Sequence, residues 1–107
     1  DESIKFYTEM LGMKLFDRGR PSRTRGETAG LQSPGSEQIL ELNCYEEGSP
    51  FATPYTTGEG LDHLGFKVDD VKGTVEALRR KGVKVALEPF DDRAFILDPN
   101  GIWIELF

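Results

Sequence analysis

Hydrophobic and polar positions along the chain predict two similar halves, each with one helix and several short strands. The first helix is expected over residues 1–11, where Ile4, Tyr7 and Leu11 fall on one stripe at helical spacing. Asp1 is expected to be its N-cap, because a short side-chain oxygen at this position accepts hydrogen bonds from the first free N–H groups. The chain therefore begins on a helix.

The second helix is expected over residues 69–82, with Val71, Val75 and Leu78 on one face. Two aspartates open this segment and three basic residues close it, and both placements complement the helix dipole. The two halves of the chain thus repeat one scheme.

Three short strands are expected after each helix, and one more is expected before the second helix, over 61–68. The others are expected at 14–18, 24–31, 37–45, 83–87, 94–97 and 102–106. The pattern favours an α+β fold of two βαβββ modules, the first strand of module one being absent from the sequence. We expect a preceding segment to supply that strand; the alternative is a native start at Asp1, with the edge open or filled by another chain. Module one is expected over 1–48, a linker over 46–60 and module two over 61–107, within one domain.

Composition limits the classes of function. A chain of 107 residues can bury one hydrophobic core, and no apolar run approaches the length of a membrane span or resembles a signal peptide. The formal charge of −6 argues against nucleic acid as a partner. One cysteine excludes an internal disulfide and favours the cytoplasm. We expect no membrane partner and a small-molecule ligand.

Four arginines lie within eight residues, at Arg18, Arg20, Arg23 and Arg25. A solvated hairpin or loop is the favoured interpretation, because runs of charge usually face water. An anion clamp is the alternative, because arginine binds carboxylates and phosphates bidentately.

Three of the expected strands each carry one potential metal ligand, Glu41, His63 and Glu105. Side chains alternate across a strand, so each of these residues lies opposite a wholly apolar face that suits packing on a helix. If the other faces line one cavity, two carboxylates and an imidazole converge there. Such a set suits a divalent Zn, Ni, Co, Mn or Fe ion and leaves positions open for substrate. Taken singly, a residue of this kind is more often structural or exposed than a metal ligand. From the residues alone, a metal site and a set of structural residues are about equally favoured.

Cys44 is expected to be a buried small hydrophobe rather than a nucleophile, because it shares the apolar face of Leu40 and Leu42. The sequence contains no glycine-rich phosphate loop. Trp103 and Phe107 share the face of Glu105. Their side chains either line the cavity or fill it as core residues.

Three segments resemble the vicinal oxygen chelate superfamily, which includes glyoxalases, bleomycin resistance proteins and extradiol dioxygenases. They are 3–15, 62–70 and the closing hairpin 97–106. The resemblance covers essentially the whole chain and implies two βαβββ modules that form a half-open barrel around a metal.

The glyoxalase I branch (lactoylglutathione lyases) is the nearest likeness. Its His, Glu, His, Glu ligand pattern implies Glu41, His63 and Glu105 as metal ligands, with the first histidine on the absent strand. It also implies a lyase or isomerase that acts on a thiol hemithioacetal of methylglyoxal. Glu105 would move the proton, with Glu41 as the second catalytic carboxylate, and two chains would pair as a homodimer. The short segment 88–93 departs from the branch and puts glutathione in doubt.

Two alternatives stay open. A metal-free drug-binding protein like those of bleomycin resistance would sequester a cationic ligand in a dimer cavity. A ferrous dioxygenase would normally use two histidines and one glutamate, and one histidine is present here.

Overall fold

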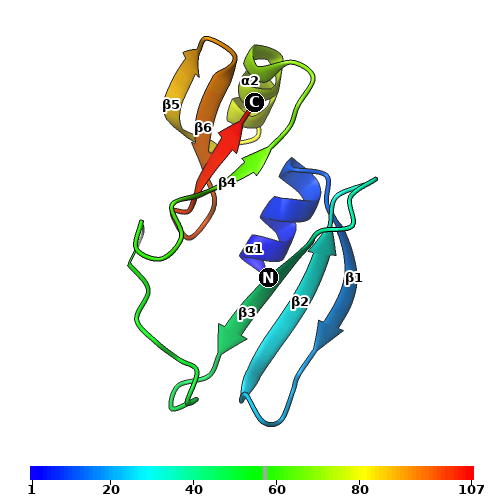
Figure 1. Ribbon diagram of the computed structural model, residues 1–107, viewed down its shortest axis with the longest axis vertical. Coiled ribbons are helices and arrows are strands. Elements are labelled where there is room, and N and C mark those ends of the chain that lie inside the picture. The colour runs from blue at the N-terminus through cyan, green and yellow to red at the C-terminus, as the bar shows by residue number, and fades with distance from the viewer. Residues whose placement is uncertain (57) are drawn as a thin grey trace. The chain divides into compact units, whose positions relative to one another are not determined.

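The computed structural model describes residues 1–56 and 58–107, which divide into two compact units, Asp1–Pro54 and Tyr55–Phe107. We call them unit 1 and unit 2 and describe each by itself. Each unit has one antiparallel or mixed sheet and one helical segment (Figure 1). The α+β class expected from the sequence is confirmed. No helix in the described ranges is long and apolar enough to cross a membrane.

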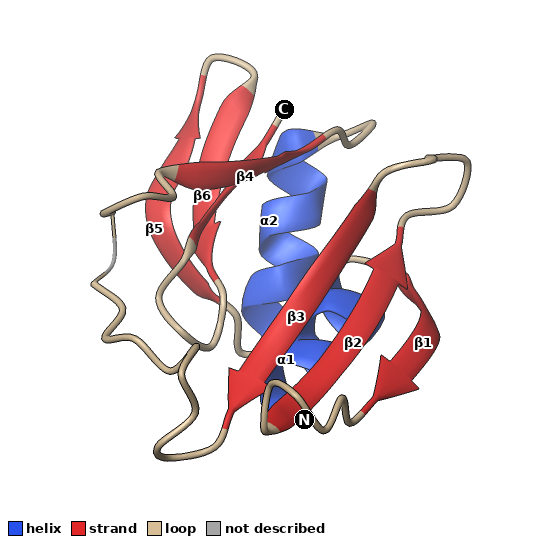
Figure 2. Cartoon of the chain, turned by 60° about the horizontal axis from the view of Figure 1, so that its bottom comes forward, coloured by secondary structure: helices blue, strands red, loops and turns tan. Residues whose placement is uncertain are grey.

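Unit 1 begins with helix α1 (Glu2–Lys5), which continues as the π-helical segment η1 (Phe6–Met10). Strands β1 (Lys14–Gly19), β2 (Gly26–Gln32) and β3 (Ile39–Tyr45) follow, in the antiparallel order β1-β2-β3. Figure 2 shows α1 behind this sheet.

The first helix differs from expectation in two ways. Its winding changes from α to π after Lys5, and this part of the helix buries Phe6 and Tyr7, whose rings meet edge to face. Asp1 does stand at the N-cap position, but its carboxylate accepts a hydrogen bond from Arg18 at 2.8 Å instead of capping the helix. An exposed ion pair with Arg18 of β1 thus replaces the expected local contact.

Unit 2 contains β4 (His63–Phe66), α2 (Val71–Arg80), β5 (Lys84–Phe90), β6 (Arg93–Leu97) and β7 (Trp103–Leu106). Its strands lie in the order β4-β7-β6-β5, with β4 and β7 parallel and the other pairs antiparallel. The β-α-β-β-β sequence of module two is therefore present.

Helix α2 lies within the range 69–82 expected from the sequence. Asp70 is the N-cap, and its Oδ1 accepts a hydrogen bond from the backbone N–H of Gly73 at 3.0 Å. The helix packs on β5 and β6 and buries Val75 and Leu78. Ile104 and Leu106 of β7 are also fully buried. Because side chains alternate, Glu105 must then lie on the face of the sheet opposite to these two residues.

The β6–β7 hairpin depends on Asp98, which is almost fully buried. Its Oδ1 accepts hydrogen bonds from the backbone N–H groups of Asn100 and Ile102, both at 2.8 Å. Gly101 has φ +81°, a conformation that costs other residues energy. The tight turn fixes the register, which pairs Phe95 with Glu105 and Leu97 with Trp103.

Candidate functional site

The parallel pairing of β4 with β7 brings the two predicted ligands of unit 2 together. Gly65 lies opposite Glu105 and His63 lies opposite Trp103, so all four share one face of the sheet. Gly65 leaves room there: a Cβ at this position would lie 3.0 Å from the Phe107 ring and 3.9 Å from Glu105 Oε2. The small residue lets the Phe107 ring and the carboxylate approach the backbone of β4.

Glu105 stands between two basic side chains. Its Oε2 lies 3.2 Å from His63 Nε2, and its Oε1 accepts a hydrogen bond from Arg93 Nη1 at 2.7 Å. The Glu105 side chain is 12% exposed, whereas that of His63 is 36% exposed and that of Arg93 is 54% exposed. A largely buried carboxylate thus has two partners that reach it from the solvent side.

His63 is held from a second direction by its neighbour in sequence. Asp62 Oδ1 lies 2.6 Å from His63 Nδ1, and the ring packs edge to face against Phe95 at 5.6 Å. The hydrogen bond to Asp62 raises the pKa of His63 above its ordinary 6.5; burial opposes this rise, and Glu105 adds to it. Asp62 therefore fixes the ring and directs Nε2 toward Glu105.

The rings of Trp103 and Phe107 lie beside the Glu105 carboxylate. The half-buried Trp103 ring contacts Phe95 at 5.5 Å, and the ring of Phe107 lies over Gly65. Both residues lie on the face of Glu105, as the alternation predicts.

Glu41 lies in unit 1, on β3 opposite Gly30 of β2. Its side chain is exposed, and its Oε1 accepts a hydrogen bond from Asn43 Nδ2 at 3.0 Å. The Phe16 ring occupies the space over Gly30, since a Cβ there would meet it at 2.7 Å. The structure thus brings His63 and Glu105 together, while the convergence of Glu41 with them stays a prediction.

The chemistry of the pair in unit 2 fits a divalent metal. His63 supplies an imidazole nitrogen and Glu105 a carboxylate oxygen, both of which are donors that a zinc ion accepts, and the two atoms lie 3.2 Å apart. Within the described ranges, no group of three or more His, Cys, Asp or Glu side chains is arranged to hold a metal. The fit therefore concerns two donors, one nitrogen and one oxygen.

Sequence reasoning missed Asp62 and Arg93. A signal for Arg93 existed: a hairpin that pairs Phe95 with Glu105 places Arg93 on the same face, next along β6. Asp62 gave no such signal, because its contact with the ring depends on rotamers at the start of β4.

Two other expectations can be compared with the structure. Cys44 is exposed, so the expectation of a buried hydrophobe was wrong. It pairs with Glu27 at an end of the sheet where the face is charged rather than apolar. In the arginine cluster, Arg18 and Arg20 both bind Glu27, and Arg25 donates to the carbonyl oxygen of Gly48 at 3.2 Å. These contacts favour the hairpin interpretation, because internal partners bind the guanidinium groups of Arg18, Arg20 and Arg25.

Comparison with known proteins defines the class of this fold and site. The Glyoxalase/Bleomycin resistance protein/Dioxygenase superfamily matches residues 1–106, and the chain belongs to this superfamily. Its α+β architecture agrees with that membership.

Among its relatives, the chain is similar to several named lactoylglutathione lyases. It is 40% identical to a probable chloroplastic lactoylglutathione lyase of Arabidopsis thaliana over 99% of this chain and 31% of that protein. It is 34% identical to a probable lactoylglutathione lyase of Vibrio parahaemolyticus over 99% of this chain and 80% of that protein. The trypanothione-dependent glyoxalase I of Leishmania major superposes with a TM-score of 0.83 and 35% identity, covering 100% of this chain and 76% of that one. The chain thus spans about a third of the Arabidopsis protein.

Proposed function

We propose that this chain is a metal-dependent lyase or isomerase of the glyoxalase I kind. Its substrate would be the hemithioacetal formed from a 2-oxoaldehyde such as methylglyoxal and a thiol. The observation that carries the proposal is the His63–Glu105 pair, 3.2 Å apart on adjacent strands of a chain that belongs to the superfamily. The similarity to lactoylglutathione lyases supports the choice of reaction.

His63 and Glu105, with Glu41, would hold one divalent Zn, Ni, Co, Mn or Fe ion. When bound, such an ion polarises the substrate oxygens and acidifies the adjacent C–H bond. Glu105 takes the proton from the carbon that bears sulfur and returns it to the neighbouring carbon, which gives a 2-hydroxyacyl thioester. No atom is lost or gained in this transfer.

Asp62 would orient the ring of His63, and Arg93 would stabilise the charge of Glu105. Asp62 accepts the Nδ1 proton of neutral His63 and so leaves the Nε2 lone pair for a metal. Arg93 neutralises Glu105 when no metal is bound and stabilises the buried carboxylate. Phe95, Trp103 and Phe107 limit the access of water to this face.

The assembly proposed is a homodimer in the cytoplasm that acts on a small molecule. The dimer follows from the resemblance to bacterial glyoxalases of similar size, in which two chains pair their modules. Light scattering coupled to gel filtration tests it: a mass near 24 kDa supports the dimer, and a mass near the 12.0 kDa of one chain contradicts it.

The test of the metal site is elemental analysis of the purified chain and its variants after incubation with zinc or nickel. About one ion per chain is expected, with loss in His63→Ala and Glu105→Gln. Glu9→Gln, at an exposed position of η1, serves as the matched control and should retain the metal. Thioester formation from methylglyoxal and a thiol should follow the metal content. Retention of the ion in Glu105→Gln would contradict the ligand assignment.

A metal-free binding protein is the second candidate, and the Arg93–Glu105 ion pair favours it. A guanidinium 2.7 Å from the carboxylate satisfies the buried charge without a metal. This candidate predicts no bound ion even after incubation with metal, together with no thioester formation.

A further inference from the structure

One row of exposed side chains crosses the sheet of unit 2 next to Glu105. Phe90 of β5 pairs with Arg93 of β6. The backbone N–H of Phe107 donates to the Phe66 carbonyl oxygen at 3.1 Å, and that of Val68 donates to the Phe107 carbonyl oxygen at 2.8 Å. These bonds extend the parallel pairing by one residue and place Lys67 opposite Phe107.

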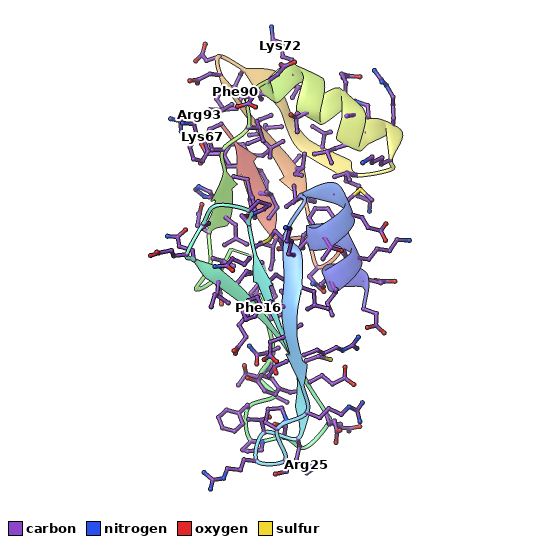
Figure 3. All side chains as sticks on the ribbon, turned by 90° about the vertical axis from the view of Figure 1, so that its right-hand side faces the viewer. Phe16, Arg25, Lys67, Lys72, Phe90 and Arg93 are labelled. Atoms are coloured by element: carbon purple, nitrogen blue, oxygen red, sulfur yellow. The ribbon has the colours of Figure 1, made fainter. Side chains whose placement is uncertain are left out.

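The β6–β7 register completes the row. Ala94 pairs with Leu106, so the next position along brings Arg93 beside Phe107. The order across the four strands is therefore Lys67, Phe107, Arg93, Phe90, which we call the cation–aromatic row. Figure 3 shows Lys67, Arg93 and Phe90 at the same end of unit 2.

The row alternates two cations with two large apolar rings, all of them accessible. Phe107 is 45% exposed and Phe90 is 47% exposed, and Lys67 is exposed as well. The chain as a whole carries a net charge of −6, whereas this row contains two cations, one on each side of Phe107. Asp92 is a competing carboxylate at this row, because its Oδ1 lies 3.8 Å from Arg93 Nε.

Arg93 links this row to the candidate site. Only its Nη1 donates to Glu105, at 2.7 Å, and a guanidinium has five N–H donors in a planar fork. The Asp92 contact at 3.8 Å is too long for a hydrogen bond. Donors of Arg93 thus remain for a second anion, and the strand that carries Arg93 lies about 4.8 Å from that of Phe107.

We propose that the cation–aromatic row binds a substrate that carries a carboxylate on an apolar group. The bound carboxylate then lies close to the reacting carbons of the same substrate. Arg93 binds the carboxylate, Lys67 supports it, and the rings of Phe107 and Phe90 contact the apolar body. The inference rests on the proposed function and narrows its substrate class: among 2-oxoaldehydes, one that carries a carboxylate is preferred over methylglyoxal.

The test measures binding of 3-phenylpropionate and of its neutral amide, 3-phenylpropionamide, to the metal-free chain by NMR titration. Neither probe needs a bound metal or turnover. We expect the acid to bind at least tenfold more tightly than the amide, with shifts at Arg93, Phe107 and Phe90. Arg93→Met should weaken acid binding about tenfold and Lys67→Met severalfold. Arg80→Met, at an exposed position of α2, is the matched control and should bind like the wild type.

Equal binding of acid and amide, no binding of the acid, or unchanged acid binding in Arg93→Met would overturn the inference. Far-UV circular dichroism of each variant separates a lost contact from a lost fold, and Arg93→Lys, which keeps the charge, should recover part of the affinity. A negative result in this binding test does not change the interpretation of the metal analysis or of the thioester assay. Selective binding of the acid by a chain that takes up no metal would instead contradict the proposed reaction.

Discussion

Glu41 of β3 and Glu105 of β7 occupy corresponding strands of the repeated scheme, yet their surroundings differ. Glu105 is 12% exposed and contacts both His63 and Arg93, whereas Glu41 is exposed and contacts Asn43 of its own strand. The difference follows from strand order. In the described part of the chain, β7 lies between β4 and β6, and β3 pairs with β2 alone. The two strands beside β7 supply both partners of Glu105: His63 comes from β4 and Arg93 from β6.

The largest expected contrast concerns the apolar residue that precedes each glutamate. Ile104→Ala should lower the free energy of unfolding of unit 2 by about 3 kcal/mol, because Ile104 is fully buried. Leu40→Ala should cost about 1 kcal/mol, because Leu40 is only half-buried. Urea unfolding followed by NMR signals from each unit measures both. Equal costs would show that the two strands are packed alike.

Substitution of the two glutamates should give a smaller difference in the free energy of unfolding. Glu105→Gln keeps the shape but removes the charge that Arg93 and His63 contact, and it should cost about 1–2 kcal/mol. Glu41→Gln should change stability by less than about 0.5 kcal/mol, as exposed substitutions usually do. The same urea titrations report these values, and a cost for Glu41→Gln as large as that for Glu105→Gln would remove the contrast.

The smallest expected effect is a change in the pKa of His63. This residue is the only histidine, so its ring signals can be titrated directly by NMR. Its pKa should lie above 6.5 and should fall in Asp62→Asn, because the hydrogen bond to Asp62 is the main cause of the rise. Glu105→Gln should lower the pKa less. Asp69→Asn, an exposed aspartate beyond β4, is the matched control and should leave it unchanged.

The sign of the pH dependence follows from the raised pKa. Protonated His63 stabilises the fold, so its contribution is complete below pH about 6.5 and is lost as the pH rises through the raised pKa. The wild type should therefore lose stability relative to Asp62→Asn as the pH rises through this window. A parallel pH profile of the two proteins would contradict the assignment.

Much of this fold follows from local pattern. The apolar stripe of α2 and the acidic residues at its start are encoded within a few residues of each other, so the sequence alone located this helix. Strand alternation likewise placed Glu105 opposite the buried Ile104 and Leu106, because the period of a strand is two.

Pairings between distant segments were decided only by the tertiary structure. The parallel alignment of β4 with β7 joins residues about forty positions apart and determines that His63 meets Glu105. Packing also changed the winding of the first helix after Lys5 and left Cys44 on a charged, exposed end of β3. Arg93 was missed because its contact with Glu105 depends on the pairing of β6 with β7, and Asp62 was missed because its contact with the His63 ring depends on rotamers.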